Sequence, residues 1–143
     1  MNRNPYDTCP TAKVILLAED DVDDQDFITE AFRTIDPQLT IHIVSNSNGV
    51  LPFLQTLTNA QLPQLIVLDY NLPGGDGCEV LQALALHERY QAIPKIVWST
   101  SNAPQYKARS LELGAISYVV KPSDIAGIET MARQMLDSCQ VTV

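Results

Sequence analysis

Polar or charged side chains directly follow four apolar segments of this sequence: Glu19 and Asp20 after residues 13–18, Asp69 after 64–68, Ser99 after 95–98, and Lys121 after 116–120. If these segments are parallel strands of one sheet, their carboxyl ends meet at the edge where α/β proteins bind ligands. The three carboxylates would then repel one another by roughly 4 kcal/mol per close pair at a surface-like dielectric. A stable fold tolerates this repulsion only if a carboxyl is protonated, if a cation lies nearby or if function requires the strain. A divalent cation such as Mg²⁺, which prefers hard oxygen ligands, removes it. With an ammonium and a hydroxyl nearby, the group meets the requirements of phosphoryl transfer to an aspartate.

Each of these residues has an ordinary structural explanation when it is taken alone. Acidic residues after a strand are often helix caps, so Glu19 and Asp20 by themselves favour a cap. Ser99 carries no signal by itself, and Lys121-Pro122 is typical of a turn. The prediction of a site rests on the matching groups at all four strand ends.

The strands must lie in one sheet for this site to form. Apolar, β-rich segments alternate regularly with stretches of helical periodicity, at residues 13–18, 39–44, 64–68, 95–98 and 116–120. Residues 15–17 and 66–68 are too apolar for half-exposed strands, which predicts a parallel sheet covered by helices on both faces. We therefore predict an α/β fold: a flavodoxin-like, doubly wound sheet of five parallel strands in the order 2-1-3-4-5, with five helices. Pro52 requires the second helix to begin near Ser47.

Length and composition fit one domain of this kind. The chain has 143 residues, of which 45% are hydrophobic and 18% charged, enough for a single domain with a core. We predict a loose arm at residues 1–12, the domain at 13–138 and a short tail at 139–143. The longest apolar run is too short to span a membrane and no secretory signal opens the chain, so we expect a cytoplasmic protein.

The net charge, the cysteines and the histidines exclude further classes of function. A net charge of −8, from 17 acidic and 9 basic residues, argues against nucleic acid as a partner. Six acidic residues lie within positions 19–26. Among them, we interpret Asp23, Asp24 and Asp26 as a solvated helix start, where carboxylates interact favourably with the helix dipole. The three cysteines and two histidines lack ligand spacing, which argues against structural zinc and a disulfide framework.

Four segments resemble the receiver domains of two-component response regulators: ILLAEDD (15–21), LIVLDYNLPGGDG (65–77), PKIVWSTS (94–101) and GAISYVVKP (114–122). The resemblance covers about residues 13–138, and the ordered set is far more specific than any single motif. It implies that Asp69 is the phosphoacceptor. It also implies that Asp20, Asp69 and the backbone carbonyl of Asn71 bind Mg²⁺, with Glu19 acting through water.

The resemblance assigns roles to the residues around the acceptor as well. Lys121 would contact the phosphoryl group, and its peptide bond to Pro122 would be cis. Ser99 would turn toward the phosphoryl oxygen on activation, and Tyr118 would rotate inward with it as a switch residue. Without the resemblance, an aromatic residue on a strand would be interpreted as packing. The lifetime of the acyl phosphate would be tuned by three residues, Asn71, Thr100 and Ser101.

The implied function is that of a stand-alone response regulator, not of an enzyme. The protein would take a phosphoryl group from a sensor histidine kinase or a histidine phosphotransfer protein, and would slowly hydrolyse it. The added charge would bias a two-state equilibrium. The output would be a downstream protein target, or a homodimer, bound through the face of helix 4 (beginning at Pro104), strand 5 and helix 5 (beginning near Ile125), with no role for nucleic acid or membrane.

Other protein classes use the same residue types. An aspartate-nucleophile phosphatase of the haloacid-dehalogenase type needs a second Asp two residues after the nucleophile, where this chain has Asn71, and a cap-domain insert. An FMN carrier of the same fold needs a phosphate-binding loop where Glu19 and Asp20 would repel the phosphate. The most serious alternative is a receiver fold used only as a docking module and never phosphorylated. Such degenerate receivers usually lose the acceptor or the acidic pocket, and this sequence keeps both.

Overall fold

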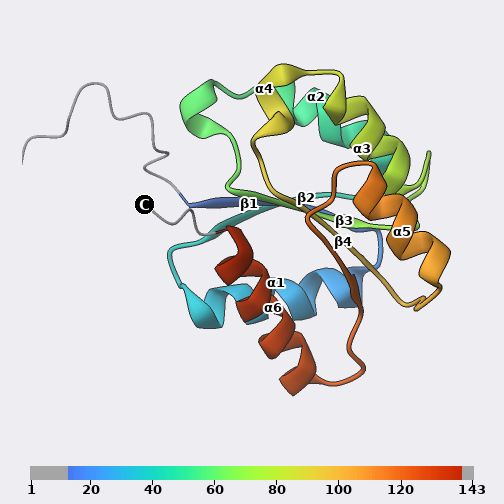
Figure 1. The fold of residues 1–143 in the computed structure, drawn as a ribbon. Helices are drawn as coiled ribbons and strands as arrows, with labels where there is room; N and C mark the ends of the chain where they lie inside the picture. The colour runs from blue at the N-terminus through green and yellow to red at the C-terminus, as the bar shows by residue number, and fades with distance from the viewer. Residues whose placement is uncertain (1–12, 140–143) are drawn as a thin grey trace, which may run out of the picture.

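The computed structural model describes residues 13–139, which form a five-stranded sheet between two layers of helices (Figure 1). The strands are β1 (Val14–Ala18), β2 (Thr40–Val44), β3 (Leu65–Asp69), β4 (Lys95–Ser99) and β5 (Ser117–Val120). All neighbouring strands are parallel and their order is β2-β1-β3-β4-β5. This arrangement confirms the predicted doubly wound sheet. The predicted arm at 1–12 and residues 140–143 lie outside the described residues.

Six α-helices occur in residues 13–139, where the sequence pattern predicted five: α1 (Val22–Ile35), α2 (Val50–Gln55), α3 (Gly77–Ala85), α4 (Glu88–Gln91), α5 (Pro104–Glu112) and α6 (Ile125–Cys139). The helix count was wrong because α4 is a single turn, too short to show helical periodicity. The extended backbone of His87 separates α4 from α3, and the buried ring of Tyr90 anchors α4 to the core. Helices 4 and 5 of the prediction are therefore α5 and α6. Pro52 lies in the first turn of α2, after a 3₁₀ turn at Ser47–Gly49.

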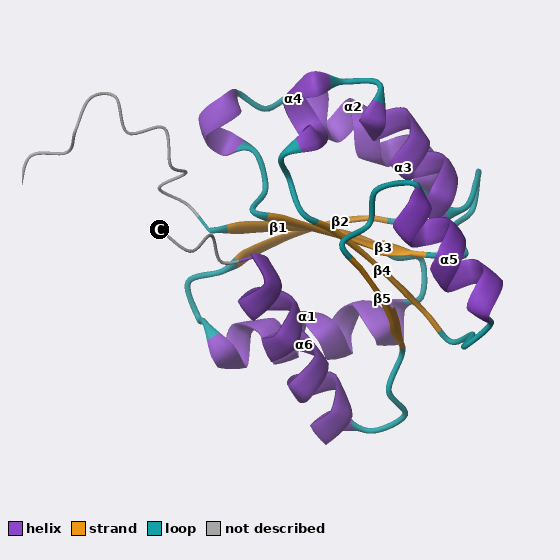
Figure 2. Cartoon of the chain, viewed as in Figure 1, coloured by secondary structure: helices purple, strands orange, loops and turns teal. Residues whose placement is uncertain are grey.

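The two helix layers explain the continuous apolar runs in the sequence. Helices α1 and α6 cover one face of the sheet, and α2, α3, α4 and α5 cover the other (Figure 2). Every residue of β1, β3 and β4 is buried, and along β1 successive residues such as Leu16 and Leu17 belong to opposite cores. The edge strands β2 and β5 are partly exposed. The central strands thus lie inside the core, which positions the residues at their ends.

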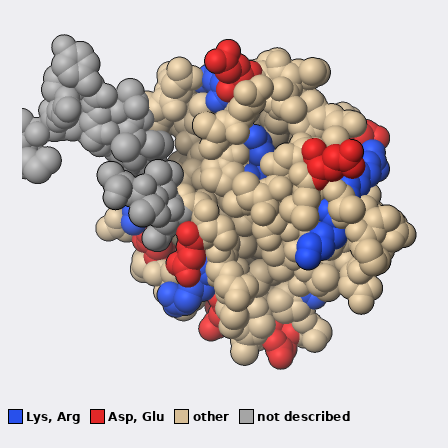
Figure 3. Space-filling model, in the orientation of Figure 1, with Lys and Arg blue, Asp and Glu red and all other residues tan. Residues whose placement is uncertain are grey.

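Neither a membrane-spanning helix in the described residues nor a large basic patch on the face in Figure 3 is found. In residues 13–139, no helix combines the length and the apolar character needed to cross a bilayer. On the face of the molecule in Figure 3, the acidic and basic side chains of the described residues are interspersed in small groups.

Helix α3 begins in direct contact with the backbone of β3. Asp76 caps this helix by accepting a hydrogen bond from the N–H of Glu79 at 2.9 Å. The N–H of Gly77 donates to the carbonyl of Tyr70 at 2.9 Å. A Cβ atom at Gly77 would lie only 2.7 Å from the carbonyl oxygen of Asp69. A glycine is therefore required where α3 meets the end of β3.

We expect Gly77→Ala to lower the free energy of unfolding by about 1–3 kcal/mol, because the added methyl group must push α3 away from β3. Gly49→Ala is the matched control. Its φ of −86° suits alanine, and its Cβ would meet its nearest neighbour, in Val44, at an ordinary 3.4 Å. Urea denaturation measures both variants. Equal stability of the two variants would contradict a tight contact at Gly77.

Candidate functional site

The register of the sheet brings the predicted site residues to one edge. β1 and β3 pair in parallel up to their carboxyl ends, which places Glu19 level with Asp69. The last residues of β4 and β5, Ser99 and Val120, are paired, so that Lys121 lies just beyond the level of Ser99. The N–H of Lys121 donates to the carbonyl of Ser99 at 2.7 Å and extends the ladder by one residue. The side chains that follow these strands therefore share one end of the sheet.

Lys121 lies at the centre of this group and contacts three carboxylates. Its Nζ is 2.9 Å from Glu19 Oε1, 2.8 Å from Asp24 Oδ2 and 3.2 Å from Asp69 Oδ2. The ammonium also lies 4.6 Å from the centre of the Trp98 ring, in a cation–π contact that favours its charged form. These contacts fix the position of the charge beside Asp69.

Burial shapes the protonation of the two most enclosed groups. Burial raises the pKa of the Glu19 carboxyl to about 7, against hydrogen bonds from the Asp21 N–H and from Lys121 that lower it. Burial also disfavours the charge of Lys121, but hydrogen bonds to Asp24 and Glu19 and the nearby charge of Asp69 raise its pKa above the ordinary value. Lys121 is therefore a permanent positive charge at the site.

Asp24 corrects one sequence-based interpretation. The sequence pattern favoured a solvated helix start for this residue, but its carboxylate pairs with Lys121. Helix α1 begins at Val22 and is capped by Asp21, which accepts a hydrogen bond from the Asp24 N–H at 2.9 Å. This places Asp24 in the first turn of α1, beside the strand ends. The sequence pattern carried no signal for this contact, because the contact depends on the residue at which α1 begins.

The acidic residues fit a divalent cation. Glu19, Asp20 and Asp69 each offer a carboxylate oxygen, and these oxygens lie within 4.8 Å of one another. Two ligands of one Mg²⁺ ion are at most about 4.2 Å apart, so a small closure is enough. Asp20 is exposed, which leaves room for water ligands. The N–H of Asn71 donates to Asp69 Oδ1 at 3.1 Å and keeps the turn after β3 close to the acceptor carboxylate.

The loop after β4 connects the hydroxyl of Ser99 with Tyr118. Ser99 is fully buried, and its Oγ accepts a hydrogen bond from the N–H of Ser101 at 3.1 Å. The hydroxyl of Tyr118 donates to the carbonyl of Ser101 at 2.6 Å. The Tyr118 ring meets the edge of Tyr70, which stacks on Tyr106 of α5 with ring centres 4.2 Å apart. Tyr118 is therefore half-buried and packs against the core on the side of α2, α3, α4 and α5.

The Lys121–Pro122 peptide bond differs from the expectation. No peptide bond among residues 13–139 is cis, so this bond is trans and the expected cis form was wrong. The expectation came only from the family resemblance. Trans is the favoured form of an X–Pro bond, and Lys121 makes all of its contacts to the carboxylates in that form.

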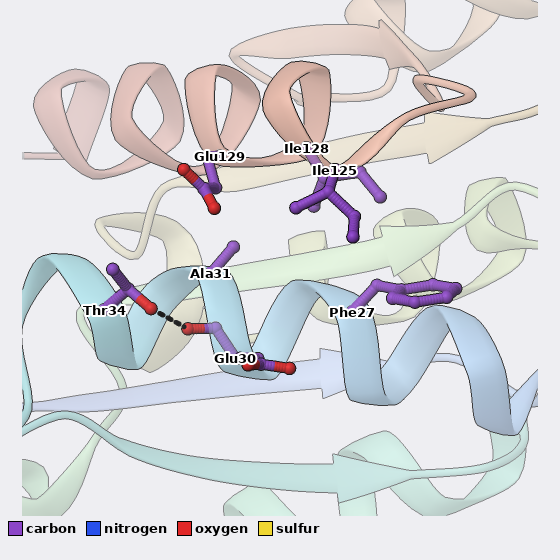
Figure 4. A pocket seen from close by; sticks show the side chains of 7 residues that line it. All are labelled: Phe27, Glu30, Ala31, Thr34, Ile125, Ile128 and Glu129. Atoms are coloured by element: carbon purple, nitrogen blue, oxygen red, sulfur yellow. Dashed lines mark hydrogen bonds between the residues drawn. The ribbon is translucent and has the colours of Figure 1, made fainter.

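A pocket between α1 and α6 is separate from this site (Figure 4). Seven residues line it: Phe27, Glu30, Ala31, Thr34, Ile125, Ile128 and Glu129. None of them belongs to the acidic group at the strand ends. The pocket is therefore not part of the charge cluster around Lys121.

Comparison with known proteins agrees with this fold. Residues 15–133 match the family model of the response regulator receiver domain. The chain therefore belongs to the response regulator receiver family of two-component signalling, whose members bind Mg²⁺ at an acidic pocket.

Particular relatives cover most of this chain. It is 32% identical over 124 residues to the response regulator Rcp1 of Synechocystis sp., covering 85% of this chain and 84% of the relative. The crystal structure of the phosphorylated cyanobacterial phytochrome response regulator RcpA has a TM-score of 0.79 at 27% identity, covering 90% of this chain and 96% of that one. The Mn²⁺-bound form of Rcp1 has a TM-score of 0.78 at 30% identity, with 92% and 96% covered.

Proposed function

We propose that Asp69 accepts a phosphoryl group from a sensor histidine kinase or a histidine phosphotransfer protein, and that the aspartyl phosphate switches a protein-binding face. The observation that carries this proposal is the ammonium of Lys121 at 3.2 Å from Asp69, next to the acidic group of Glu19 and Asp20. Membership of the receiver family and similarity to a phosphorylated response regulator support it.

The chemistry at Asp69 is a substitution at phosphorus. One carboxylate oxygen of Asp69 forms a bond to phosphorus, while the phosphorus–nitrogen bond of the donor phosphohistidine breaks and its electron pair stays on the imidazole. The N–H of Asn71 holds Oδ1, and the ammonium of Lys121 faces Oδ2. Lys121 thus stands where charge develops on the phosphoryl oxygens, and its buried position strengthens that interaction.

A metal ion would be held by Asp20, Asp69 and the backbone carbonyl of Asn71, with Glu19 acting through a water molecule. When bound, Mg²⁺ supplies positive charge that offsets the charge of the phosphoryl oxygens. In its absence, Lys121 is the cation that balances the clustered carboxylates.

We expect Mg²⁺ to change the fluorescence of Trp98, the single tryptophan of the chain, because metal binding alters the contacts of the ammonium that lies over its ring. In a titration, Asp20→Asn should weaken apparent Mg²⁺ affinity by at least about tenfold, as even indirect partners of a metal contribute that much. Asp26→Asn, an exposed acid on α1, is the charge-matched control. Identical titrations for the two variants would show that Asp20 does not contribute to Mg²⁺ binding.

The switch would work through the loop after β4. On phosphorylation, the hydroxyl of Ser99 would leave the N–H of Ser101 and bind a phosphoryl oxygen. Because Tyr118 also bonds to Ser101, this movement reaches β5, and through Tyr70 and Tyr106 it reaches α5. The face of α5, β5 and α6 would then bind a downstream protein target or a second copy of the chain.

The aspartyl phosphate would also be hydrolysed slowly by the protein itself. Asn71 and Thr100 are exposed and Ser101 is half-buried, and all three lie within two residues of Asp69 or Ser99 along the chain. We propose that these three residues set the lifetime of the phosphorylated state.

Two other functions are compatible with the same fold. A docking module that is never phosphorylated would keep the α5–β5–α6 face but would have no use for the clustered carboxylates around Lys121. An aspartate-nucleophile phosphatase would need a general acid at the position of Asn71, which has an amide in its place. The geometry therefore favours the receiver function over both.

Incubation with acetyl phosphate and Mg²⁺, followed by intact mass measurement, tests the proposal. We expect a gain of one phosphoryl group with Mg²⁺ and none when a chelator is added. If folded, Mg²⁺-loaded protein gains nothing from acetyl phosphate, and nothing from a phosphorylated histidine phosphotransfer protein, the docking-module function takes its place.

A further inference from the structure

The ammonium of Lys121 has no donor left for an incoming phosphoryl group. An ammonium carries three N–H donors. Each of them meets a carboxylate at hydrogen-bond distance, in Glu19, Asp24 and Asp69. For Lys121 to contact a phosphoryl oxygen with a full hydrogen bond, one of these three partners must be released.

The three carboxylates differ in how well water can replace the ammonium. The side chain of Glu19 is fully buried, and that of Asp69 is only 7% exposed. Before the bond to phosphorus forms, releasing either one would leave a buried charge without its partner, which is costly. Asp24 is 32% exposed, so water can solvate its carboxylate after the bond is lost. Asp24 is therefore the partner that Lys121 can release most easily.

The backbone of Asp24 is anchored in the first turn of α1. Its N–H is bonded to the capping carboxylate of Asp21. Its 2.8 Å contact is the shortest of the three, and the contact to the acceptor Asp69 is the longest, at 3.2 Å. The ammonium thus lies closer to the carboxylate on α1 than to that of the acceptor.

From this geometry we infer that Asp24 is a positioning residue that competes with the phosphoryl group for Lys121, and so slows phosphoryl acceptance. The inference rests on the proposed function of Asp69. It acts through Lys121 and not through a metal, because the carboxylates that cluster for a cation are Glu19, Asp20 and Asp69. Asp24 then sets how readily the protein responds to a donor.

Rates of phosphorylation by acetyl phosphate at saturating Mg²⁺ test this inference. We expect Asp24→Asn to raise the maximal rate by about fivefold to tenfold, as for the loss of one competing charge-assisted hydrogen bond. Asp23→Asn removes the same charge from the neighbouring residue, which is exposed, and should change the rate by less than about twofold because exposed charges are screened. Asp24→Glu keeps the carboxylate and should return the rate toward the wild-type value.

Two further measurements distinguish competition for Lys121 from simple repulsion between Asp24 and an anionic donor. In a Lys121→Gln background, Asp24→Asn should have no additional effect. If Asp24 acted by repulsion alone, Asp24→Asn would lower the KM for acetyl phosphate and this effect would fade at high salt, whereas relief of competition raises the maximal rate at any salt concentration. A rate for Asp24→Asn equal to that of Asp23→Asn, or a slower rate, would overturn the inference, as would an undiminished effect in the Lys121→Gln background.

Failure of the inference can be told apart from failure of the proposed function. Beryllofluoride, a phosphoryl analogue that needs no transfer step, provides the second readout, with Asp24→Asn expected to bind it about fivefold more tightly. If the wild type takes up neither the phosphoryl group nor beryllofluoride, the proposed function fails and the inference falls with it. If the wild type takes up both and the Asp24 and Asp23 variants agree, only the inference fails.

Discussion

Replacing Lys121 with alanine should lower the free energy of unfolding by about 3–5 kcal/mol, because it removes the partner of charges that stay buried. Glu19 is fully buried and Asp69 nearly so, and both bond to this one ammonium. The same variant should accept phosphoryl groups about 10²–10³-fold more slowly, since it lacks the charge that meets the developing phosphoryl oxygens. Chemical denaturation in metal-free buffer and the acetyl phosphate assay measure the two effects.

The loss of stability in Lys121→Ala should depend on pH in a definite direction. In the wild type the folded-state pKa of Glu19 is already raised to about 7 from 4.5. The contribution of Glu19 to the free energy of unfolding is therefore fully present below pH 4.5 and is lost as the pH rises through 7. Without Lys121, one of the two hydrogen bonds that lower this pKa disappears. The variant should therefore be closest to the wild type in stability at low pH and furthest from it above pH 7.

Lys13→Ala is the control for this variant. Lys13 also pairs with an aspartate, Asp36, at 2.7 Å, but this pair lies at the surface. Surface ion pairs contribute little to stability, so its removal should have a small effect at every pH. Equal losses for the Lys121 and Lys13 variants would show that the buried cluster does not depend on its cation.

Asp69→Asn should abolish phosphoryl acceptance while making the fold at least as stable as the wild type. The amide lacks the nucleophilic carboxylate, yet it has nearly the same shape. Removing one negative charge also relieves the repulsion between Asp69 and Glu19, while Lys121 keeps its bonds to Glu19 and Asp24. We expect a gain of about 1 kcal/mol in the free energy of unfolding, as is common when a site kept for function is neutralised.

Intact mass after acetyl phosphate treatment and chemical denaturation measure these two effects. Asp26→Asn, an exposed acid on α1, should keep full phosphoryl acceptance. Phosphorylation of Asp69→Asn at the wild-type level would show that another residue is the acceptor. A large loss of stability would show that repulsion between Asp69 and Glu19 does not destabilise the wild type.

The sheet and the position of the site could be predicted because the sequence encodes both directly. Strands buried on both faces are apolar throughout, as β1, β3 and β4 are, and this pattern requires helices on both sides. Once the strands are parallel, their ends share an edge, so Glu19, Asp69 and Lys121 must come together. The predicted order of strands then fixed which carboxylates would be neighbours.

The features that could not be predicted depend on how helices and loops are oriented. Whether Asp24 faces solvent or Lys121 depends on the rotation of α1 about its axis, which is set by the residue at which the helix begins. Helix α4 is a single turn held by the burial of Tyr90, and one turn has no periodicity to detect. The placement of Tyr118 depends on a hydrogen bond to the carbonyl of Ser101, and backbone carbonyls carry no sequence signal.

Locating the phosphoryl group on the chain tests the role of Asp69 most directly. The protein is treated with acetyl phosphate and Mg²⁺, the acyl phosphate is reduced with borohydride to convert the modified aspartate to homoserine, and the peptides are sequenced by mass spectrometry. We expect homoserine at position 69 alone. Homoserine at Asp20 or at another acidic residue, or protein that carries the phosphoryl group with Asp69 intact, would contradict the assignment of Asp69 as the acceptor.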